Sequence, residues 1–296
     1  MSGAVRYQVR HQTVYAYAGS VAHAQHLLHL KPRETATQRC LEQAIDVWPA
    51  AQRSNLVDAF GNHATRLELD RPHQNLEVTA RMRVELLPRP VVEEMETLPW
   101  EQVRDGLHYT SEPIKPEWLE AARYRAQSPF VAIKRLFELY ASDCFPPGTP
   151  VLAGARALMN KIHREFDYES GATHIGISLL EVLAQQRGVC QDYAHFMIAC
   201  LRSLGLSARY VSGYLHTAHG EEGPEHLGAD ASHAWVAVYA PPFGWIELDP
   251  TNNLRVDREH VVLAWGRDFG DVSPLRGVLL GGGTHSLDVG VSVLPV

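Results

Sequence analysis

The chain has 296 residues, of which 45% are hydrophobic and 21% carry charge. Such a composition supports a buried core and excludes a disordered or fibrous protein. The 27 lysine and arginine residues are outnumbered by 34 aspartate and glutamate residues, which gives a net charge of −7 at pH 7. This acidic balance does not provide the basic surface of a nucleic-acid binder, so nucleic acid is not an expected partner.

The sequence favours a soluble cytoplasmic protein with no membrane partner. Residues 1–17 lack the apolar stretch of a secretory leader, and no later run approaches the ~18 apolar residues that cross a bilayer. The cysteines are too few and too irregularly spaced for a disulfide scaffold or a zinc site. They are Cys40, Cys144, Cys190 and Cys200.

The first part of the chain predicts an all-β domain. Polar and apolar residues alternate, as in half-buried strands, in residues 7–17, 40–48, 64–70 and 76–87. We therefore expect a β-sandwich-like N-terminal domain over residues 1–95. Closely spaced prolines in the acidic stretch that follows predict an irregular connector over residues 96–128.

From residue 129 onward the pattern changes to helices followed by strands. Apolar residues recur at helical spacing in residues 130–143, 151–166, 177–188 and 190–204. Strand patterns follow in residues 208–215, 233–240, 245–249, 276–281 and 287–296. The sequence thus predicts an α+β core over residues 129–296 that includes the C-terminal strands.

The run RGVCQDY, residues 187–193, contains the strongest local signal for chemistry. Gly188 allows a sharp turn, and Cys190 then falls in the first turn of the fourth helix. Unpaired N–H groups and the helix dipole favour a thiolate there. Such positions lower a cysteine pKa from ~8.5 to roughly 3.5–7.5. Cys190 is therefore the candidate nucleophile.

A cysteine nucleophile needs a base and a group that orients the base, and two later strands offer both. His233 opens one strand, and Asp249 ends the next. If these strands pair antiparallel around the turn at 241–244, the two residues lie at nearly equal distances from the turn and can touch. Asp249 would then hold one nitrogen of the His233 ring while the other nitrogen faces Cys190.

Three segments in this order resemble the core of the bacterial transglutaminase-like superfamily of papain-type thiol enzymes: RGVCQDYAHFMIACLRSLGLSARYVSGYL, ASHAWVAVY and GWIELDPTNN. The run HVVLAWGRDFGDVSPLRG and the β-rich start are also similar to these proteins, so the resemblance covers most of the chain. It implies a papain-like fold in which the cysteine-bearing helix packs on an antiparallel sheet. It also implies a triad with Cys190 as nucleophile, His233 as general base and acid, and Asp249 as the orienting partner.

Attack on a carbonyl creates an oxyanion, which needs hydrogen-bond donors. The backbone N–H of Cys190 is one candidate because it lies at a helix start. A second donor could be the side chain of Gln185, Gln186 or Gln191, and spacing alone does not choose among them.

Other residues are candidates for the walls of the site. Trp235 and Trp245 flank the catalytic pair on the two strands, where they would exclude water from the thioester. The Gly-rich, acidic segment 216–232 predicts a mobile loop beside the site, and Asp230 within it is a further pocket candidate. Asp192, one turn into the cysteine-bearing helix, is expected to stabilise the helix start instead.

Histidines elsewhere in the sequence are expected neither to bind a metal nor to act as the base. His23, His26 and His29 lie close together, but no cysteine or acidic residue completes a ligand set at a suitable spacing. His195 lies five residues after Cys190 in the same helix, so its side chain points roughly 140° away. The predicted chemistry requires no organic cofactor and no metal.

The triad predicts a thiol hydrolase that cleaves peptide or isopeptide amide bonds through a thioester acyl-enzyme, with peptides or proteins as substrates. The first alternative is transglutaminase-type acyl transfer, which shares the thioester but passes the acyl group to an amine acceptor. The second alternative is a non-catalytic scaffold that binds a partner through the β domain and the acidic loop. The sequence leaves the scissile bond and the oligomeric state open.

Overall fold

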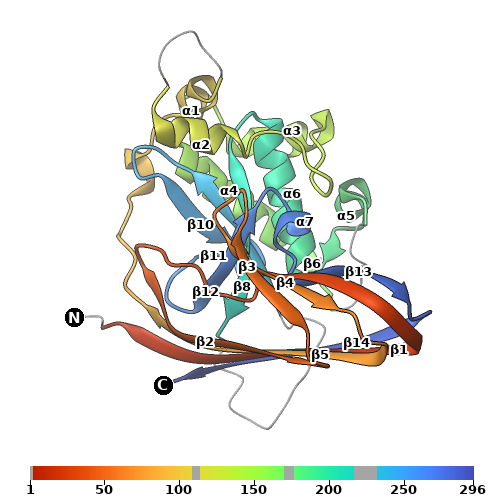
Figure 1. Cartoon of the computed structure of the whole chain (residues 1–296). Helices are drawn as coiled ribbons and strands as arrows, with labels where there is room; N and C mark the ends of the chain where they lie inside the picture. Colours follow the sequence, from red (N-terminus) through yellow and green to blue (C-terminus); the bar gives the residue numbers. More distant parts are fainter. Residues whose placement is uncertain (1–2, 109–113, 170–176, 217–231) are drawn as a thin grey trace.

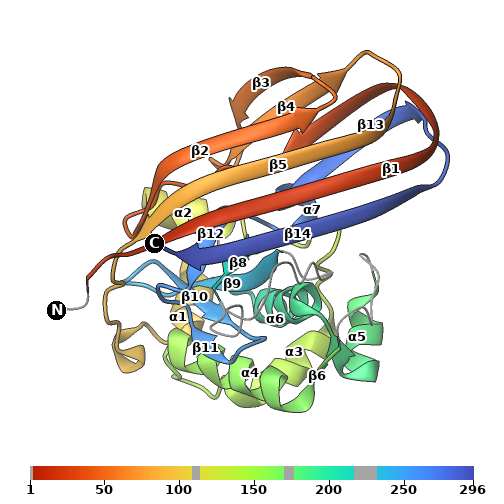
Figure 2. The same ribbon diagram turned by 90° about the horizontal axis from the view of Figure 1, so that it is seen from below.

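The computed structural model describes residues 3–108, 114–169, 177–216 and 232–296. Figures 1 and 2 show a long, curved β-sheet on one side and, against it, a second sheet with helices packed around it. The chain begins in the first sheet, crosses to the second part and returns to the first sheet with its last strands. The fold is therefore of the α+β class.

The long strand β1 (Val5–Leu28) is the centre of the first sheet. Its first half pairs with β5 (His73–Leu86) and β14 (His285–Pro295). Its second half pairs with β4 (His63–Leu69) and β13 (Leu275–Gly281). Register shifts near the middle of β1 separate the two sets of neighbours. Along much of β1, buried residues alternate with more exposed ones, as the sequence pattern predicts.

Two further strands extend this sheet to seven: β2 (Gln38–Trp48) pairs with β5, and β3 (Gln52–Val57) pairs with β4. These seven strands form one continuous hydrogen-bonded sheet, and the sandwich-like arrangement expected for residues 1–95 stays a prediction. The place of the C-terminal strands differs from the expectation: the expected division assigns them to residues 129–296, but they pair with β1. Alternating polarity indicates a half-buried strand without indicating its partner, which explains this difference.

Two short helices occupy the segment 96–128, which the sequence predicts to be irregular. α1 (Trp100–Gly106) begins directly after Pro99, and α2 (Pro116–Ala122) begins with a proline. Proline suits the first turn of a helix because the N–H that it lacks would have no intrahelical partner there. Two of the prolines that suggest irregular structure therefore mark helix starts.

The remaining helices belong to the second part of the molecule (Figure 1). They are α3 (Arg135–Ala141), α4 (Val151–Glu165), α5 (Leu179–Gln185), α6 (Cys190–Ser203) and α7 (Phe269–Val272). Shorter elements are the 3-10 turns Glu94–Glu96 and Ser142–Cys144 and the parallel pair β6 (Asp167–Tyr168) and β7 (Arg187–Gly188). Helix α6 is buried on all sides, as expected for the central helix of a core.

The second sheet has five antiparallel strands in the order β11-β10-β9-β8-β12. They are β8 (Ala208–Leu215), β9 (His233–Tyr239), β10 (Trp245–Asp249), β11 (Leu254–Arg255) and β12 (His260–Gly266). Helix α6 packs on β8 and β9, in one apolar core with side chains such as Tyr210 and Val236. A cysteine-bearing helix on an antiparallel sheet is the arrangement that the sequence predicts.

The N-terminal part of the chain holds the edge strand β12 through two side-chain amides. Gln38 donates to Val262 O and accepts from the Val262 N–H, both at 2.7 Å. Asn62 makes the same two bonds with Trp265, at 2.8 and 3.0 Å. An edge strand leaves backbone groups unpaired, and these amides bond both backbone groups of each of the two residues.

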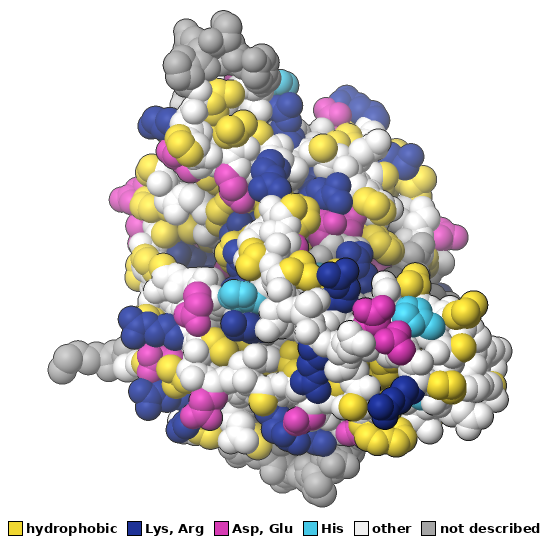
Figure 3. All heavy atoms as spheres, in the orientation of Figure 1, with side chains coloured by type: hydrophobic (Ala, Val, Ile, Leu, Met, Phe, Trp, Pro, Cys, Tyr) yellow, Lys and Arg dark blue, Asp and Glu magenta, His cyan; other side chains and the backbone are white. Residues whose placement is uncertain are grey.

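The surface of the molecule mixes both signs of charge. On the face drawn in Figure 3, basic and acidic side chains are interspersed over both parts of the molecule. The net charge of −7 is thus not gathered into one patch on this face. Within the described residues, no helix has the length and apolar character that a membrane span requires.

Candidate active site

The start of α6 is shaped by a local cap. Asp192 Oδ2 accepts a hydrogen bond of 2.9 Å from the Val189 N–H, which confirms the structural role expected for Asp192. A Cβ on Gly188 would lie 2.6 Å from the same carboxylate oxygen, so glycine is needed for this close approach. Cys190 is the first residue of the helix, and its backbone N–H therefore has no intrahelical acceptor.

His233 and Asp249 meet across the β9–β10 hairpin. The two strands pair with Leu248 opposite Val236, so the next pair along sets Asp249 opposite Trp235. Asp249 thus reaches His233 diagonally. His233 Nε2 lies 2.8 Å from Asp249 Oδ2, and the predicted contact is confirmed.

The Cys190 thiol lies close enough to this imidazole to influence its pKa. Cys190 Sγ is also 3.9 Å from Ser232 O, at the residue before His233. Burial by itself lowers the pKa of His233, but the hydrogen bonds to Asp249 and Cys190 outweigh it and raise the pKa to about 10. The protonated imidazolium is therefore the stable form between the thiol and the carboxylate.

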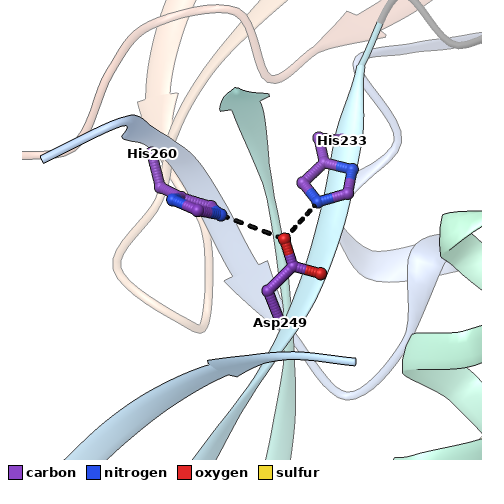
Figure 4. Close-up of side chains that lie close together, drawn as sticks. All are labelled: His233, Asp249 and His260. Carbon is purple, nitrogen blue, oxygen red and sulfur yellow. Dashed lines mark hydrogen bonds and ion pairs between the residues drawn. The ribbon is translucent and has the colours of Figure 1, made fainter. Parts of the chain in front are cut away.

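The Asp249 carboxylate is fully buried and accepts five hydrogen bonds. Its Oδ1 accepts from the backbone N–H groups of Thr251 and Asn252, at 3.0 and 3.2 Å. Its Oδ2 accepts from the Asn252 side chain at 2.7 Å and from both His233 and His260, the latter at 3.1 Å (Figure 4). Burial raises the pKa of Asp249, but these donors and the two imidazoles outweigh burial and hold the pKa well below its usual range.

His260 and Asn252 are contacts of this carboxylate that the sequence analysis does not identify. For Asn252 a signal exists, because the run Asp-Pro-Thr-Asn is typical of a turn in which side chains bond nearby backbone groups. His260 has no comparable signal. It lies 11 residues after Asp249, on the edge strand of the sheet, and only the folded chain brings it to the site.

Of the two tryptophans expected beside the catalytic pair, only Trp235 lies there. Its fully buried ring is 6.0 Å from the His233 ring and meets the His260 ring edge-on at 5.1 Å. Trp245 is opposite Tyr239 at the other end of the hairpin, so its expected place in the pocket is wrong. Trp245 starts β10 next to the turn, and the four residues to Asp249 correspond to roughly 13 Å of strand.

The predicted second oxyanion donor stays a prediction for all three glutamines. Gln185 is the last residue of α5 and Gln186 follows it. Both are exposed, and Gln185 accepts a bond of 3.3 Å from Arg187. Gln191 is half-buried directly after the nucleophile candidate. The pocket candidate Asp230, together with residues 217–231, lies outside the described residues.

His195 has a structural place in the core. Its ring stacks between those of Phe130 and Tyr210, and its Nε2 accepts a hydrogen bond of 3.1 Å from the Phe269 N–H. Burial lowers the pKa of His195 to about 4. The ring is thus neutral at pH 7 and connects α6 to α7, which agrees with the choice of His233 as the base.

Two groups in the described part of the chain bring possible metal ligands within 4.8 Å of one another: His233, Asp249 and His260, and His23, Glu68 and Asp70. In the first group both histidines already hydrogen-bond one carboxylate oxygen, at 2.8 and 3.1 Å. A zinc ion needs ~2.0–2.2 Å to each ligand and would have to displace both bonds. The second group is at least partly exposed. Glu68 of β4 and Asp70 just after this strand lie beside His23, a proximity that the spacing in the sequence does not predict.

Comparisons with known proteins cover both parts of the chain. The bacterial transglutaminase-like N-terminal region matches residues 7–85, and the transglutaminase-like superfamily matches residues 140–250. An uncharacterised protein of Mycobacterium tuberculosis is 37% identical over 312 residues, which cover 100% of this chain and 94% of the relative. A protein-glutamine gamma-glutamyltransferase of Pseudomonas aeruginosa is 36% identical over 75 residues, which cover 24% of this chain and 11% of that protein.

A solved structure shares the whole arrangement. The protein of Cytophaga hutchinsonii named "Putative Cysteine Protease" superposes with a TM-score of 0.78 at 20% identity, covering 100% of this chain and 92% of that chain. The common fold thus extends over the N-terminal sheet as well as the helical part. The segment matched to the superfamily contains Cys190, His233 and Asp249. The chain therefore belongs to the transglutaminase-like superfamily, with the bacterial N-terminal region before its core.

Proposed function

We propose that the protein is a thiol hydrolase that cleaves peptide or isopeptide amide bonds with Cys190, His233 and Asp249. The observation that carries the proposal is the line of three groups: a thiol at a helix start, an imidazole with a raised pKa, and a fully buried carboxylate 2.8 Å from that imidazole. This is the arrangement by which a cysteine nucleophile is paired with an oriented base.

The proposed reaction has two halves. With His233 protonated, the Cys190 thiolate bonds to the carbonyl carbon, and the oxyanion is held by donors that include the Cys190 N–H. The C–N bond then breaks, and His233 gives its proton to the leaving amine. Water attacks the resulting thioester while neutral His233 takes up a proton from it. The C–S bond breaks, the acid leaves, and the thiolate is restored beside protonated His233.

Acyl transfer to an amine is the second candidate function. It is favoured by the similarity of 75 residues to the Pseudomonas glutamyltransferase. Transfer uses the same thioester and differs in the group that attacks it, an amine in place of water. A non-catalytic scaffold is the third candidate, and it would not require a thiol, a base and an orienting carboxylate in contact.

The proposal places the activity in the cytoplasm, on peptide or protein substrates and without a cofactor, a nucleic acid or a membrane as partner. The negative net charge supports the proposal that nucleic acid is not a partner. The proposal of no cofactor is supported by chemistry that the protein's own side chains can complete. Cell fractionation with an antibody against the native protein checks the compartment. Recovery in a membrane or secreted fraction would contradict it.

The first test measures iodoacetamide labelling of each cysteine by peptide mass spectrometry from pH 5 to 10. The structure offers matched controls, since burial raises the pKa of Cys40, raises that of Cys144 to about 11 and raises that of Cys200 well above its ordinary value. We expect rapid labelling below pH 7 at Cys190 alone, and its loss in His233→Ala. Equal labelling of Cys190 and the controls would contradict the thiolate and bring the scaffold forward.

The second test separates hydrolysis from transfer. A pool of peptides and isopeptides is incubated with the wild type, Cys190→Ala and the matched variant Cys200→Ala, with and without a fluorescent primary amine. Hydrolysis predicts release of an amine in water alone, lost only in Cys190→Ala. Covalent incorporation of the fluorescent amine that outpaces hydrolysis would favour transfer. Full cellular activity of Cys190→Ala would favour the scaffold.

A further inference from the structure

A buried histidine outside the triad contacts the Asp249 carboxylate. His260 has a side chain with no exposed surface, and its Nε2 lies 3.1 Å from Asp249 Oδ2. Its Nδ1 is buried without a hydrogen-bond partner. Buried polar atoms are nearly always hydrogen-bonded, so burying this imidazole with an unpaired Nδ1 is costly. The role of the side chain is therefore sought in the hydrogen bond that its Nε2 makes with Asp249.

The direction of the bond follows from the chemistry of the two groups. Asp249 is ionised and can only accept, so His260 carries a hydrogen on Nε2 and donates it. His233 donates to the same oxygen at 2.8 Å. Asp249 Oδ2 therefore lies between two imidazoles, whose ring centroids are 6.0 Å apart (Figure 4).

We propose that His260 is a positioning residue of the site, which holds the Asp249 carboxylate so that Oδ2 faces His233. The inference rests on the proposed function of Cys190, His233 and Asp249. The bonds of Thr251 and Asn252 approach the carboxylate from the turn that follows it. His260 holds Oδ2 from a separate strand, and it thereby limits rotation of the carboxylate away from the His233 ring.

The backbone that carries His260 is itself fixed from outside the sheet. Gln38, from the N-terminal sheet, bonds both backbone groups of Val262, two residues after His260. The ring of His260 also packs edge-on against fully buried Trp235. These contacts give His260 one place in the fold, as a residue that orients another must have. They also give the N-terminal sheet a part in the geometry of the site.

The test compares two substitutions that differ in one donor. His260→Gln keeps an N–H at the position of Nε2, and His260→Leu fills the space without a donor. The readout is the pH profile of Cys190 alkylation by iodoacetamide, which needs no substrate. We expect Cys190 in His260→Leu to be alkylated about tenfold more slowly at pH 6, which is the effect of losing one hydrogen bond to a charged group. We also expect the alkaline inflection of the pH profile to move to lower pH. His260→Gln should stay within about threefold of the wild type.

The matched control is His195→Gln, which changes another buried histidine of the core and should leave the profile unchanged. Thermal unfolding of each variant checks that the protein compared is folded. A wild-type profile for His260→Leu would overturn the inference, and so would an equal loss in His260→Gln, which would indicate packing alone. A shift of the alkaline inflection to higher pH would also overturn it, because His260 would then weaken the pull of Asp249 on the His233 proton. If wild-type Cys190 itself is unreactive or independent of His233, the proposed function fails first.

Discussion

Strand β10 carries two buried carboxylates that point to the same face of the sheet two residues apart, and their partners differ in kind. Asp249 is bonded by the imidazoles of His233 and His260, and an imidazole can act as a general acid or base. Glu247 is bonded by the indole of Trp235 at 2.7 Å and by the guanidinium of Arg89 at 3.2 Å, and neither of these donors acts as a general acid or base. Both carboxylates are protected from solvent, so burial does not distinguish them.

The difference teaches that the function of a buried carboxylate is decided by its donors. For Glu247, burial raises the pKa, but the charge of Arg89 and the bonds from Trp235 and Arg89 outweigh it and lower the pKa. The result is a fixed ion pair between the N-terminal part of the chain and the sheet. For Asp249 the same balance holds a movable proton on His233, next to a thiol. One site is suited to stability and the other to proton transfer.

The largest expected effect separates the two carboxylates by reactivity. The amide in Asp249→Asn carries no negative charge, so it no longer stabilises the imidazolium of His233. The Cys190 thiolate then loses the positive charge that stabilises it, and its alkylation rate at pH 6 falls roughly 300-fold. Glu247→Gln should change that rate less than about threefold. Stopped-flow alkylation of folded protein makes the measurement, and equal losses in the two variants would refute the division.

The next effect concerns stability. Arg89→Met leaves the Glu247 carboxylate buried with its ion-pair partner removed. Breaking such a pair costs about 3 kcal/mol of the free energy of unfolding. Urea unfolding measures that loss, with Arg81→Met, which breaks an exposed pair with Asp46, as the control. A loss of less than about 1 kcal/mol, the level of a surface pair, would show that the Glu247 site contributes little to stability.

Trp235 connects the two carboxylates and gives a smaller effect. Its indole N–H bonds Glu247, while its ring packs beside His233 and His260. Trp235→Phe removes the donor and part of the ring, which costs about 2 kcal/mol of unfolding free energy. Since the remaining ring still covers the histidines, the alkylation rate of Cys190 should fall no more than about threefold. A much larger fall would mean that the indole also orients the catalytic pair.

Sequence patterns predict the parts of this site that are local in the chain. The helix start at Cys190 follows from Gly188 and helical spacing, and the contact of His233 with Asp249 follows from hairpin pairing. Contacts between distant strands are not encoded this way. His260 contacts Asp249 only once the sheet has assembled. The last two strands of the chain pair with β1, and tertiary packing decides this pairing. Trp245 shows the limit within a hairpin, since proximity in sequence to Asp249 still left several residues of strand between them.

The smallest effect is a pH dependence that belongs to one carboxylate only. The pKa of His233 is raised to about 10 in the folded protein, while an unfolded histidine titrates near 6.5. The folded state therefore keeps a proton that the unfolded chain loses, and this contribution is complete below pH 6.5 and is lost as the pH rises toward 10. The slope is at most about 1.4 kcal/mol per pH unit.

The measurement uses Cys190→Ser, because a thiol that ionises would cancel part of the proton balance whereas the serine hydroxyl stays protonated. The free energy of unfolding of Cys190→Ser should fall between pH 6.5 and 8.5 more steeply than that of Cys190→Ser with His233→Gln. Adding Arg89→Met instead should lower stability at every pH and leave the slope unchanged, since the Glu247 pair does not titrate there. Equal slopes with and without His233 would show that Asp249 does not hold the imidazolium, and the contrast between the two carboxylates would be lost.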